Sequence, residues 1–173
     1  TCSFSAPSEP QNISVSTQYA KSGQTVALSW RVASAGTNNP VSGYAIYRDG
    51  VAYKTDISSG VTSVNVPVHS SAGGSYAYSV VTIGQYSNSA QSESVTVYTY
   101  SDPQAPKTIA VSDKNPDAED TLTLSWSDAS NGSYNKITGY RVYVSKNQDS
   151  GYQTLLETTS QSVNITAPSG MGE

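Results

Sequence analysis

The sequence is short of the residues on which catalysis and metal binding usually depend. Its 173 residues include one cysteine, Cys2, and one histidine, His69. A single cysteine can form no disulfide within the chain, and one Cys with one His falls short of the ligands that a zinc site needs. Catalysis of the Ser-His-Asp or Cys-His kind requires a histidine with positioned partners, whereas His69 stands in a Ser- and Gly-rich stretch. We therefore expect no enzyme, no catalytic residue and no cofactor in this chain.

Charge is scarce as well. Asp, Glu, Lys and Arg make up 13% of the residues, and the formal net charge is −4. A weakly acidic chain is a poor electrostatic match for nucleic acid or anionic lipid, and no run approaches the roughly 18 apolar residues that span a bilayer. We expect neither nucleic-acid binding nor membrane insertion. The abundant Ser, Thr, Asn, Gln, Gly and Tyr suit an extracellular location, at a cell surface or on a virion.

What the sequence does contain is one pattern that occurs twice. The segments TVALSW and SGYAIY of the first copy return in the second copy as TLTLSW and TGYRVY. The offset is 96 residues, because Trp126 follows Trp30 by 126 − 30 = 96 and Tyr140 follows Tyr44 by 140 − 44 = 96. A repeat of this length favours two domains, since a β-sandwich of the immunoglobulin type takes about 100 residues.

Apolar and polar residues alternate through both copies with the period of two that indicates β-strands. Val26, Leu28 and Trp30 thereby share one face of an expected strand. The pair Asp49-Gly50, between two such runs, predicts a hairpin with a two-residue turn. We expect seven strands in the first copy and no segment with helical period, which predicts a two-sheet sandwich.

The 96-residue offset also sets the expected domain boundaries. Residues 4–10 match residues 100–106, so residues 1–9 have the pattern of the tail of a preceding module plus its linker. The first sandwich is expected at 10–100, a short linker at 101–105 and the second sandwich at 106–173. The prolines at 103 and 106 predict a semi-rigid connection.

The second copy stops before its pattern is complete. After a three-residue insertion Glu173 corresponds to Gly74, so nothing in the second copy corresponds to residues 75–98 and their two expected strands. A sandwich without those strands leaves its core face and strand edges open to water. We expect either that the natural chain continues beyond Glu173 or that a neighbouring subunit supplies the strands by β-augmentation.

The two copies resemble fibronectin type III domains. The residues that carry the resemblance are Pro10, Trp30 at the end of Leu-Ser-Trp, Gly43-Tyr44 with Ile46-Tyr47, and Tyr76-x-Tyr78-x-Val80. It covers residues 10–99 and, truncated, 106–173, and it implies an all-β fold of tandem immunoglobulin-like antiparallel β-sandwiches, the second lacking its last two strands. The Ser-, Tyr- and Thr-rich style is similar to modules of Gram-positive bacterial surface proteins and phage structural proteins.

The resemblance also implies structural roles for particular residues. Trp30 and Trp126 are expected in the two cores, and packing accounts for Tyr44 and Tyr140 beside them. Tyr76 is the candidate for the corner hydrogen bond that an early tyrosine of its strand makes in this family.

One acidic cluster is a candidate metal site. Asp113, Asn115, Asp117 and Glu119 carry alternate oxygens, and Ca²⁺ takes six to eight oxygen ligands. The cluster lacks the glycine and the distal glutamate of a helix-flanked calcium loop. The alternative, which we favour, is a solvated loop between strands.

Tyrosine is abundant where phenylalanine is almost absent, with thirteen residues against one. Tyrosine can stack on a sugar ring while its hydroxyl forms hydrogen bonds, and it is enriched at binding surfaces. Tyr19, Tyr86 and Tyr134 fall in expected loops or at strand edges and are candidate glycan-binding residues. Ordinary surface exposure is the alternative for all three.

The sequence as a whole predicts a non-enzymatic structural or adhesion array of a bacterial cell-surface or phage virion protein, which spaces or displays binding parts. The expected partners are a protein or glycan on a cell surface or virion, and neighbouring repeat modules or subunits. The alternatives are a carbohydrate- or cell-wall-binding module and an accessory module of a secreted polysaccharide-degrading enzyme.

Overall fold

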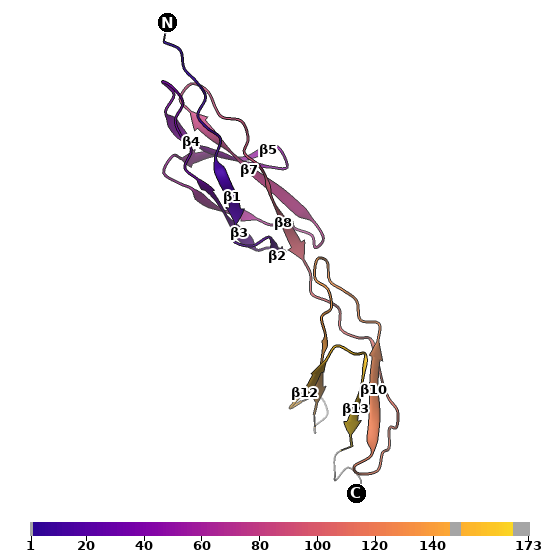
Figure 1. Cartoon of the computed structure of the whole chain (residues 1–173). Helices are drawn as coiled ribbons and strands as arrows, with labels where there is room; N and C mark the ends of the chain where they lie inside the picture. Colours follow the sequence, from indigo (N-terminus) through magenta and orange to yellow (C-terminus); the bar gives the residue numbers. More distant parts are fainter. Residues whose placement is uncertain (1, 146–149, 168–173) are drawn as a thin grey trace. The chain divides into compact units, whose positions relative to one another are not determined.

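The computed structural model describes residues 2–145 and 150–167, and these form strands connected by turns and loops, without a helix (Figure 1). The chain divides into two compact units, Thr1–Ser101 and Asp102–Glu173. Each unit is built from sheets whose strands come from separate parts of the sequence, and apart from β2 with β8 the neighbouring strands pair antiparallel.

The first unit is a sandwich of a three-stranded and a five-stranded sheet. The smaller sheet has the order β1 (Gln11–Val15), β3 (Thr25–Arg31), β6 (Ser63–Pro67). The larger sheet has the order β2 (Tyr19–Lys21), β8 (Val95–Tyr100), β7 (Ser75–Gly84), β4 (Val41–Arg48), β5 (Val51–Ser58). This distribution of strands is an immunoglobulin-like topology.

One strand of the first unit had no counterpart in the seven that the sequence predicted. The strand β2 spans three residues and pairs in parallel with β8, so that Ala20 faces Thr99. Three residues are too few to show an alternating pattern, and therefore only the pairing reveals this strand.

The core of the first unit lies between the two sheets, where the alternating apolar residues of both face each other. Trp30 is 5% exposed and Tyr44 is 0% exposed, and their rings meet edge to face with centroids 5.4 Å apart. This geometry is the favoured one for aromatic pairs. The buried apolar set comprises Ala20, Val26, Leu28, Trp30, Tyr44, Ile46, Ile57, Val66, Val68, Tyr78, Val80 and Val97.

The Asp49-Gly50 hairpin is confirmed. Asp49 and Gly50 have φ of 53° and 80°, the positive values that a type I′ turn requires, and they join β4 to β5. The Asp49 carboxylate also accepts a hydrogen bond from the amide of Ala77, which ties the turn to β7.

The corner hydrogen bond is made by Tyr78, and the assignment to Tyr76 was wrong. The fully buried Tyr78 donates its hydroxyl proton to the Pro67 carbonyl, with an oxygen–oxygen distance of 2.5 Å. Tyr76 is only half-buried, and its ring lies 5.0 Å from that of His69. Residues two apart on a strand face the same side, so alternation alone cannot choose between these two tyrosines.

The second unit repeats five of these strands. One sheet has the order β13 (Ser162–Thr166), β10 (Thr121–Ser127), β9 (Thr108–Val111), and the other pairs β11 (Tyr140–Val144) with β12 (Gln153–Thr158). These strands correspond to β6, β3, β1, β4 and β5. Within residues 102–145 and 150–167 no strand corresponds to β7 or β8. The expected fold class, tandem sandwiches of which the second lacks its last two strands, is confirmed.

The buried hydroxyl of Tyr78 predicts how the first unit responds to alkali. Burial raises the pKa of Tyr78 to about 12 from its ordinary value of 10.0. The unfolded chain therefore loses this proton near pH 10, whereas the folded unit keeps it until about pH 12. The contribution to stability is complete below pH 10 and is lost as the pH rises toward 12.

Tyr78→Phe should lower the free energy of unfolding at pH 7 by roughly 1–3 kcal/mol, because the Pro67 carbonyl loses its buried donor. It should also flatten the loss of stability between pH 10 and 12. Urea unfolding followed by Trp30 fluorescence in a Trp126→Phe background measures both effects. Tyr86→Phe, at an exposed site, is the control, and an alkaline decline of equal slope in both variants would contradict the assignment.

Candidate functional site

Of the three tyrosines proposed for glycan binding, Tyr19 and Tyr86 belong to the first unit and Tyr134 to the second. Tyr19 stacks on Tyr98, with ring centroids 5.3 Å apart and planes inclined by 21°. Tyr86 lies beside Phe4 with centroids 5.7 Å apart, in the loop that follows the opposite end of β7. Tyr134 belongs to the second unit and has a φ of 49°, the left-handed region that aromatic residues rarely adopt. Within the first unit, Tyr19 and Tyr86 therefore lie at opposite ends of β7 and form no common surface.

The acidic loop of the second unit uses its carboxylates to stabilise its own backbone. Asp113 accepts a hydrogen bond from the amide of Asn115, and Asp120 accepts one from the amide of Asp117. Glu119 has a φ of 70°. Among the described residues, no three His, Cys, Asp or Glu side chains are placed to hold a metal ion together. The structure does not gather the calcium candidates Asp113, Asn115, Asp117 and Glu119 into a site.

A stack of rings around Arg48 fixes the edge of the larger sheet in the first unit. The Arg48 guanidinium lies between Tyr53 of β5 and Tyr76 of β7, at 4.7 and 4.5 Å from the two ring centroids. Each such cation–π contact contributes about 0.5–1 kcal/mol at an exposed site. The stack joins three neighbouring strands, which gives Tyr76 a structural role although it does not make the corner hydrogen bond.

The segment before β1 is held along the loop that precedes β4. The amide of Ser8 donates to the Ser34 carbonyl at 2.9 Å, and the amide of Ser34 donates to the Ser8 hydroxyl at 2.8 Å. Nearer the start of the chain, the amide of Ser5 donates to the Thr37 carbonyl at 3.1 Å. The backbone amides of this leading segment are thus hydrogen-bonded to the loop before β4.

One buried amide completes this attachment. Asn39 is 1% exposed, and its Nδ2 donates to the carbonyls of Ser5 and Ser87 at 2.9 and 3.0 Å. Its Oδ1 accepts from the amide of Tyr86 at 2.9 Å. The group of Ser5, Asn39, Tyr86 and Ser87, here named the Asn39 clamp, joins the leading segment, the loop before β4 and the loop after β7. No periodic pattern of residues predicts this clamp, because all four residues lie in loops.

The second unit repeats the loop part of this arrangement. The amide of Gln104 donates to the Ser130 carbonyl at 2.9 Å, at the positions 96 residues after Ser8 and Ser34. Gly132 and Asn135 exchange backbone hydrogen bonds of 2.8 and 3.3 Å, as Gly36 and Asn39 do with 3.1 and 3.3 Å. The leading segment of the second unit is therefore bound to its own sandwich in the same way.

An apolar cleft of about 670 Å³ opens between the two sheets of the second unit. Its apolar lining includes Pro106, Ile109, Leu124, Trp126, Ile137, Tyr140, Val142 and Tyr152. Ile109 is 68% exposed, whereas Ile13, its counterpart in the first unit, is half-buried against the core. Trp126 keeps the edge-to-face contact with Tyr140, at 5.3 Å between centroids. The two sheets of the second unit thus pack through Trp126 and Tyr140, while one side of the core between them remains exposed.

In the first unit the corresponding space is filled by β7 and β8. The strand β4 pairs with β5 on one edge and with β7 on the other, and Ile46 faces Val80 across the second pairing. Val80 and Val97 are fully buried there. In the second unit the described strand β11 pairs only with β12, so the edge that faces β7 in the first unit has no neighbouring strand among the described residues.

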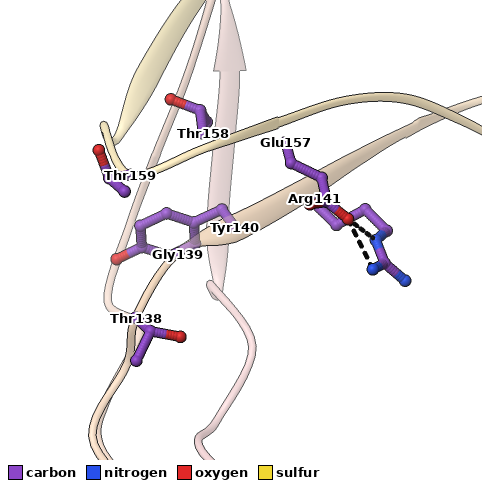
Figure 2. Close-up of a pocket in the computed structure, with 7 residues that line it drawn as sticks. All are labelled: Thr138, Gly139, Tyr140, Arg141, Glu157, Thr158 and Thr159. Atoms are coloured by element: carbon purple, nitrogen blue, oxygen red, sulfur yellow. Dashed lines mark hydrogen bonds and ion pairs between the residues drawn. The ribbon is translucent and has the colours of Figure 1, made fainter.

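A second hollow, on β11 and β12, is polar (Figure 2). Arg141 Nε donates to Glu157 Oε1 at 2.8 Å, and both side chains are more than half exposed. Hydrogen bonds with Tyr143 and Glu157 raise the pKa of Arg141. Exposed ion pairs of this kind contribute little to stability, because water and salt screen the two charges. Figure 2 shows the pair directed away from the Tyr140 ring, which also lines this hollow.

Comparison with known proteins gives only a likeness of fold. No protein-family model matches the sequence, and no curated protein matches it. The FN1–FN3 domains of chicken CNTN1 are similar in structure, with a TM-score of 0.43 and 13% identity over 94% of this chain and 57% of that one. The central fibronectin-III array of RIM-binding protein gives a TM-score of 0.35 and 15% identity over 91% and 51% of the two chains. The chain thus spans a little over half the length of these structures.

These neighbours are arrays of fibronectin type III domains, but the assignment of the fold rests on the sheet order and strand pairing described above. For the part of the chain that the structure describes, no helix is long and apolar enough to cross a membrane.

The open cleft predicts that the second unit unfolds before the first. Each unit contains one tryptophan, so Trp126→Phe leaves Trp30 to report on the first unit and Trp30→Phe leaves Trp126 to report on the second. We expect a lower urea midpoint for the Trp126 signal, because less apolar surface is buried around it. Coincident midpoints in the two variants would contradict this expectation.

Proposed function

We propose that this chain is part of a non-enzymatic structural or adhesion array that spaces or displays binding parts on a bacterial cell surface or a phage virion. The observation that carries the proposal is the repeated attachment of each leading segment to its own sandwich, at Ser8 with Ser34 and at Gln104 with Ser130. A flexible tether needs no such hydrogen bonds. A spacer does, because its modules must begin at a fixed point on the scaffold.

The composition of the chain supports exposure outside the cell. Only 13% of the residues are charged, and the sequence is rich in Ser, Thr, Asn, Gln and Tyr. The first unit forms its core without a disulfide, since Cys2 is exposed and is the only cysteine. The fold therefore does not depend on the redox state of its surroundings.

Surface labelling of the intact source tests the location. Antibodies raised against the first unit should bind intact cells or virions without permeabilisation. Antibodies against a cytoplasmic protein of the same source provide the control. Labelling that appears only after lysis would contradict the proposal.

The Asn39 clamp predicts that the leading segment is coupled to the stability of the first unit. Asn39→Ala should lower the free energy of unfolding by about 2–4 kcal/mol, because the variant leaves several buried backbone groups without partners. It should also speed hydrogen exchange at the amides of Ser5 and Ser8. Thr37→Ala, an exposed change in the same loop, is the matched control. Unchanged exchange at Ser5 and Ser8 in Asn39→Ala would show that the clamp does not hold the segment.

Carbohydrate binding is a second candidate function, favoured by the pair Phe4 and Tyr86. Their side chains are 53% and 60% exposed and lie close enough to form one aromatic surface. Rings presented in this way can stack on the apolar faces of sugars. The function would place a glycan at the loop end of the first unit, next to the Asn39 clamp.

Calorimetric titration with cell-wall polysaccharides and a glycan array separates the two functions. Binding that is lost in Tyr86→Ala and kept in Tyr134→Ala would support the carbohydrate function. If no polysaccharide binds, the carbohydrate function is contradicted and the spacer function remains as the one candidate.

A further inference from the structure

We propose that β13 of the second unit is a self-association edge, at which two copies of this chain join by antiparallel pairing of β13 with β13. The pairing extends the three-stranded sheet of each copy into one continuous sheet across a twofold axis. This sheet has the same three members in both units, so the proposal is independent of the apolar cleft and of the strands β7 and β8. It goes beyond the spacer function and does not depend on the location of the protein.

The hydrogen bonds at the two ends of β13 fix which of its residues face the open edge. At one end the amide of Trp126 donates to the Gln161 carbonyl at 3.0 Å, and at the other the amide of Ala167 donates to the Asp120 carbonyl at 2.8 Å. Backbone groups alternate in direction along an antiparallel strand, so the odd-numbered residues from 161 to 167 bond toward β10. The amides and carbonyls of the residues between them point outward: Ser162, Asn164 and Thr166.

The outward side of β13 has no neighbouring strand among the described residues. The order of the sheet is β13, β10, β9, which places β13 at its end, and the side chains of all three outward-facing residues are exposed. A row of unpaired amides and carbonyls at a sheet edge is a template for another strand.

The first unit closes the same edge with a proline. Pro67 of β6 faces Thr25, and Thr166 of β13 faces Thr121, which follows Thr25 by 121 − 25 = 96 residues. Proline has no amide proton, so β6 lacks the donor that Thr166 presents. Prolines on edge strands hinder further pairing. The two units therefore differ at this edge, and the edge of the second unit is the one open to pairing.

The sequence of β13 fits a second copy of itself. When two copies pair antiparallel about Asn164, Ser162 lies opposite Thr166. On the other face of the strand, Val163 lies opposite Ile165. In this register outward-facing residues meet outward-facing residues, and each such pair exchanges two backbone hydrogen bonds. Hydroxyl pairs and β-branched pairs are favourable cross-strand neighbours. The contact uses up the free edge of both copies, so association stops at a dimer.

The other edges of the first unit carry features that hinder pairing. The register of β1 with β3 shifts near Asn12, which has a φ of 55°, the register of β4 with β5 shifts twice, and β2 spans three residues. Bulges and short strands protect an edge. By contrast, β13 pairs with β10 without a register shift, and residues 158–167 contain no charged side chain. The strand β13 thus combines a regular backbone with neutral side chains.

Sedimentation equilibrium of the full 173-residue chain, from micromolar to millimolar concentration, measures the association. A contact between two strands of five residues is small, so we expect a weak and reversible dimer. A chain that stays monomeric at millimolar concentration would overturn the proposal.

Residue-resolved hydrogen exchange locates the contact. The outward amides of Ser162, Asn164 and Thr166 should exchange roughly tenfold more slowly once about nine chains in ten are dimeric, because exchange then proceeds from the remaining monomer. The amides of Val163 and Ile165 already bond toward β10 and should not respond to concentration. Protection that appears at β11 and not at β13 would overturn the proposal.

A proline substitution tests the backbone pairing. Thr166→Pro gives β13 the residue that β6 carries at this position, so the fold accommodates it. It removes the outward amide and leaves the bonds toward β10 in place, and it should weaken dimerisation about tenfold or more while the urea midpoint of Trp126 fluorescence stays the same. Thr166→Val keeps the amide and the branched side chain and is the matched control. Equal association of the two variants would overturn the proposal.

A charge at the twofold axis gives a second test that leaves the backbone unaltered. Asn164→Lys brings two like charges opposite each other in the dimer, so it should weaken association, and added salt should restore part of the loss. Asn65→Lys makes the same change at the corresponding exposed position of β6 and is the control. Association that Asn164→Lys leaves unchanged, or that both variants weaken equally, would overturn the proposal.

Discussion

The first unit depends above all on the position of β7 between β4 and β8. This one strand extends the sheet on both sides and covers the core with Tyr78 and Val80. Its side chains also reach outside the sheet, since Tyr78 bonds to the Pro67 carbonyl and the Thr82 hydroxyl donates to the Ser8 carbonyl at 2.8 Å. A central strand of this kind links the two sheets, the corner and the leading segment into one cooperative structure, because each of these parts is paired with it.

The second unit shows how much of the scaffold forms without that strand. Its two sheets keep the pairings of β10 with β9 and β13 and of β11 with β12, and the contact of Trp126 with Tyr140 matches that of Trp30 with Tyr44. The two units differ in how far their apolar side chains are exposed. Ile109 is more exposed than its counterpart in the first unit, because nothing among the described residues covers that side of the core. Local strand pairing and global closure of the core are therefore separable in this fold.

The features that bear on function lie where the two units agree in their loops. Both units bind their leading segment through the loop that precedes β4 in the first unit and β11 in the second. In both loops a glycine and an asparagine exchange backbone hydrogen bonds. The aromatic residues are distributed differently, as the pair Phe4 and Tyr86 belongs to the first unit alone. A shared attachment with variable surface residues suits an array whose modules are connected alike and present different surfaces.

Sequence patterns alone were enough to predict the described strands other than β2, the two-residue hairpin at Asp49-Gly50, the sandwich fold class and the lack of counterparts to β7 and β8 among the described residues of the second copy. These are properties of alternation, turn chemistry and repeat spacing, all of which act over a few residues or at a constant offset. The choice of Tyr78 over Tyr76 for the corner hydrogen bond required the folded structure, because both tyrosines face the same side of β7 and differ in what packs against them. The short strand β2, the Asn39 clamp and the separation of Tyr19 from Tyr86 likewise required the fold, since each is set by contacts between segments that lie far apart in the sequence.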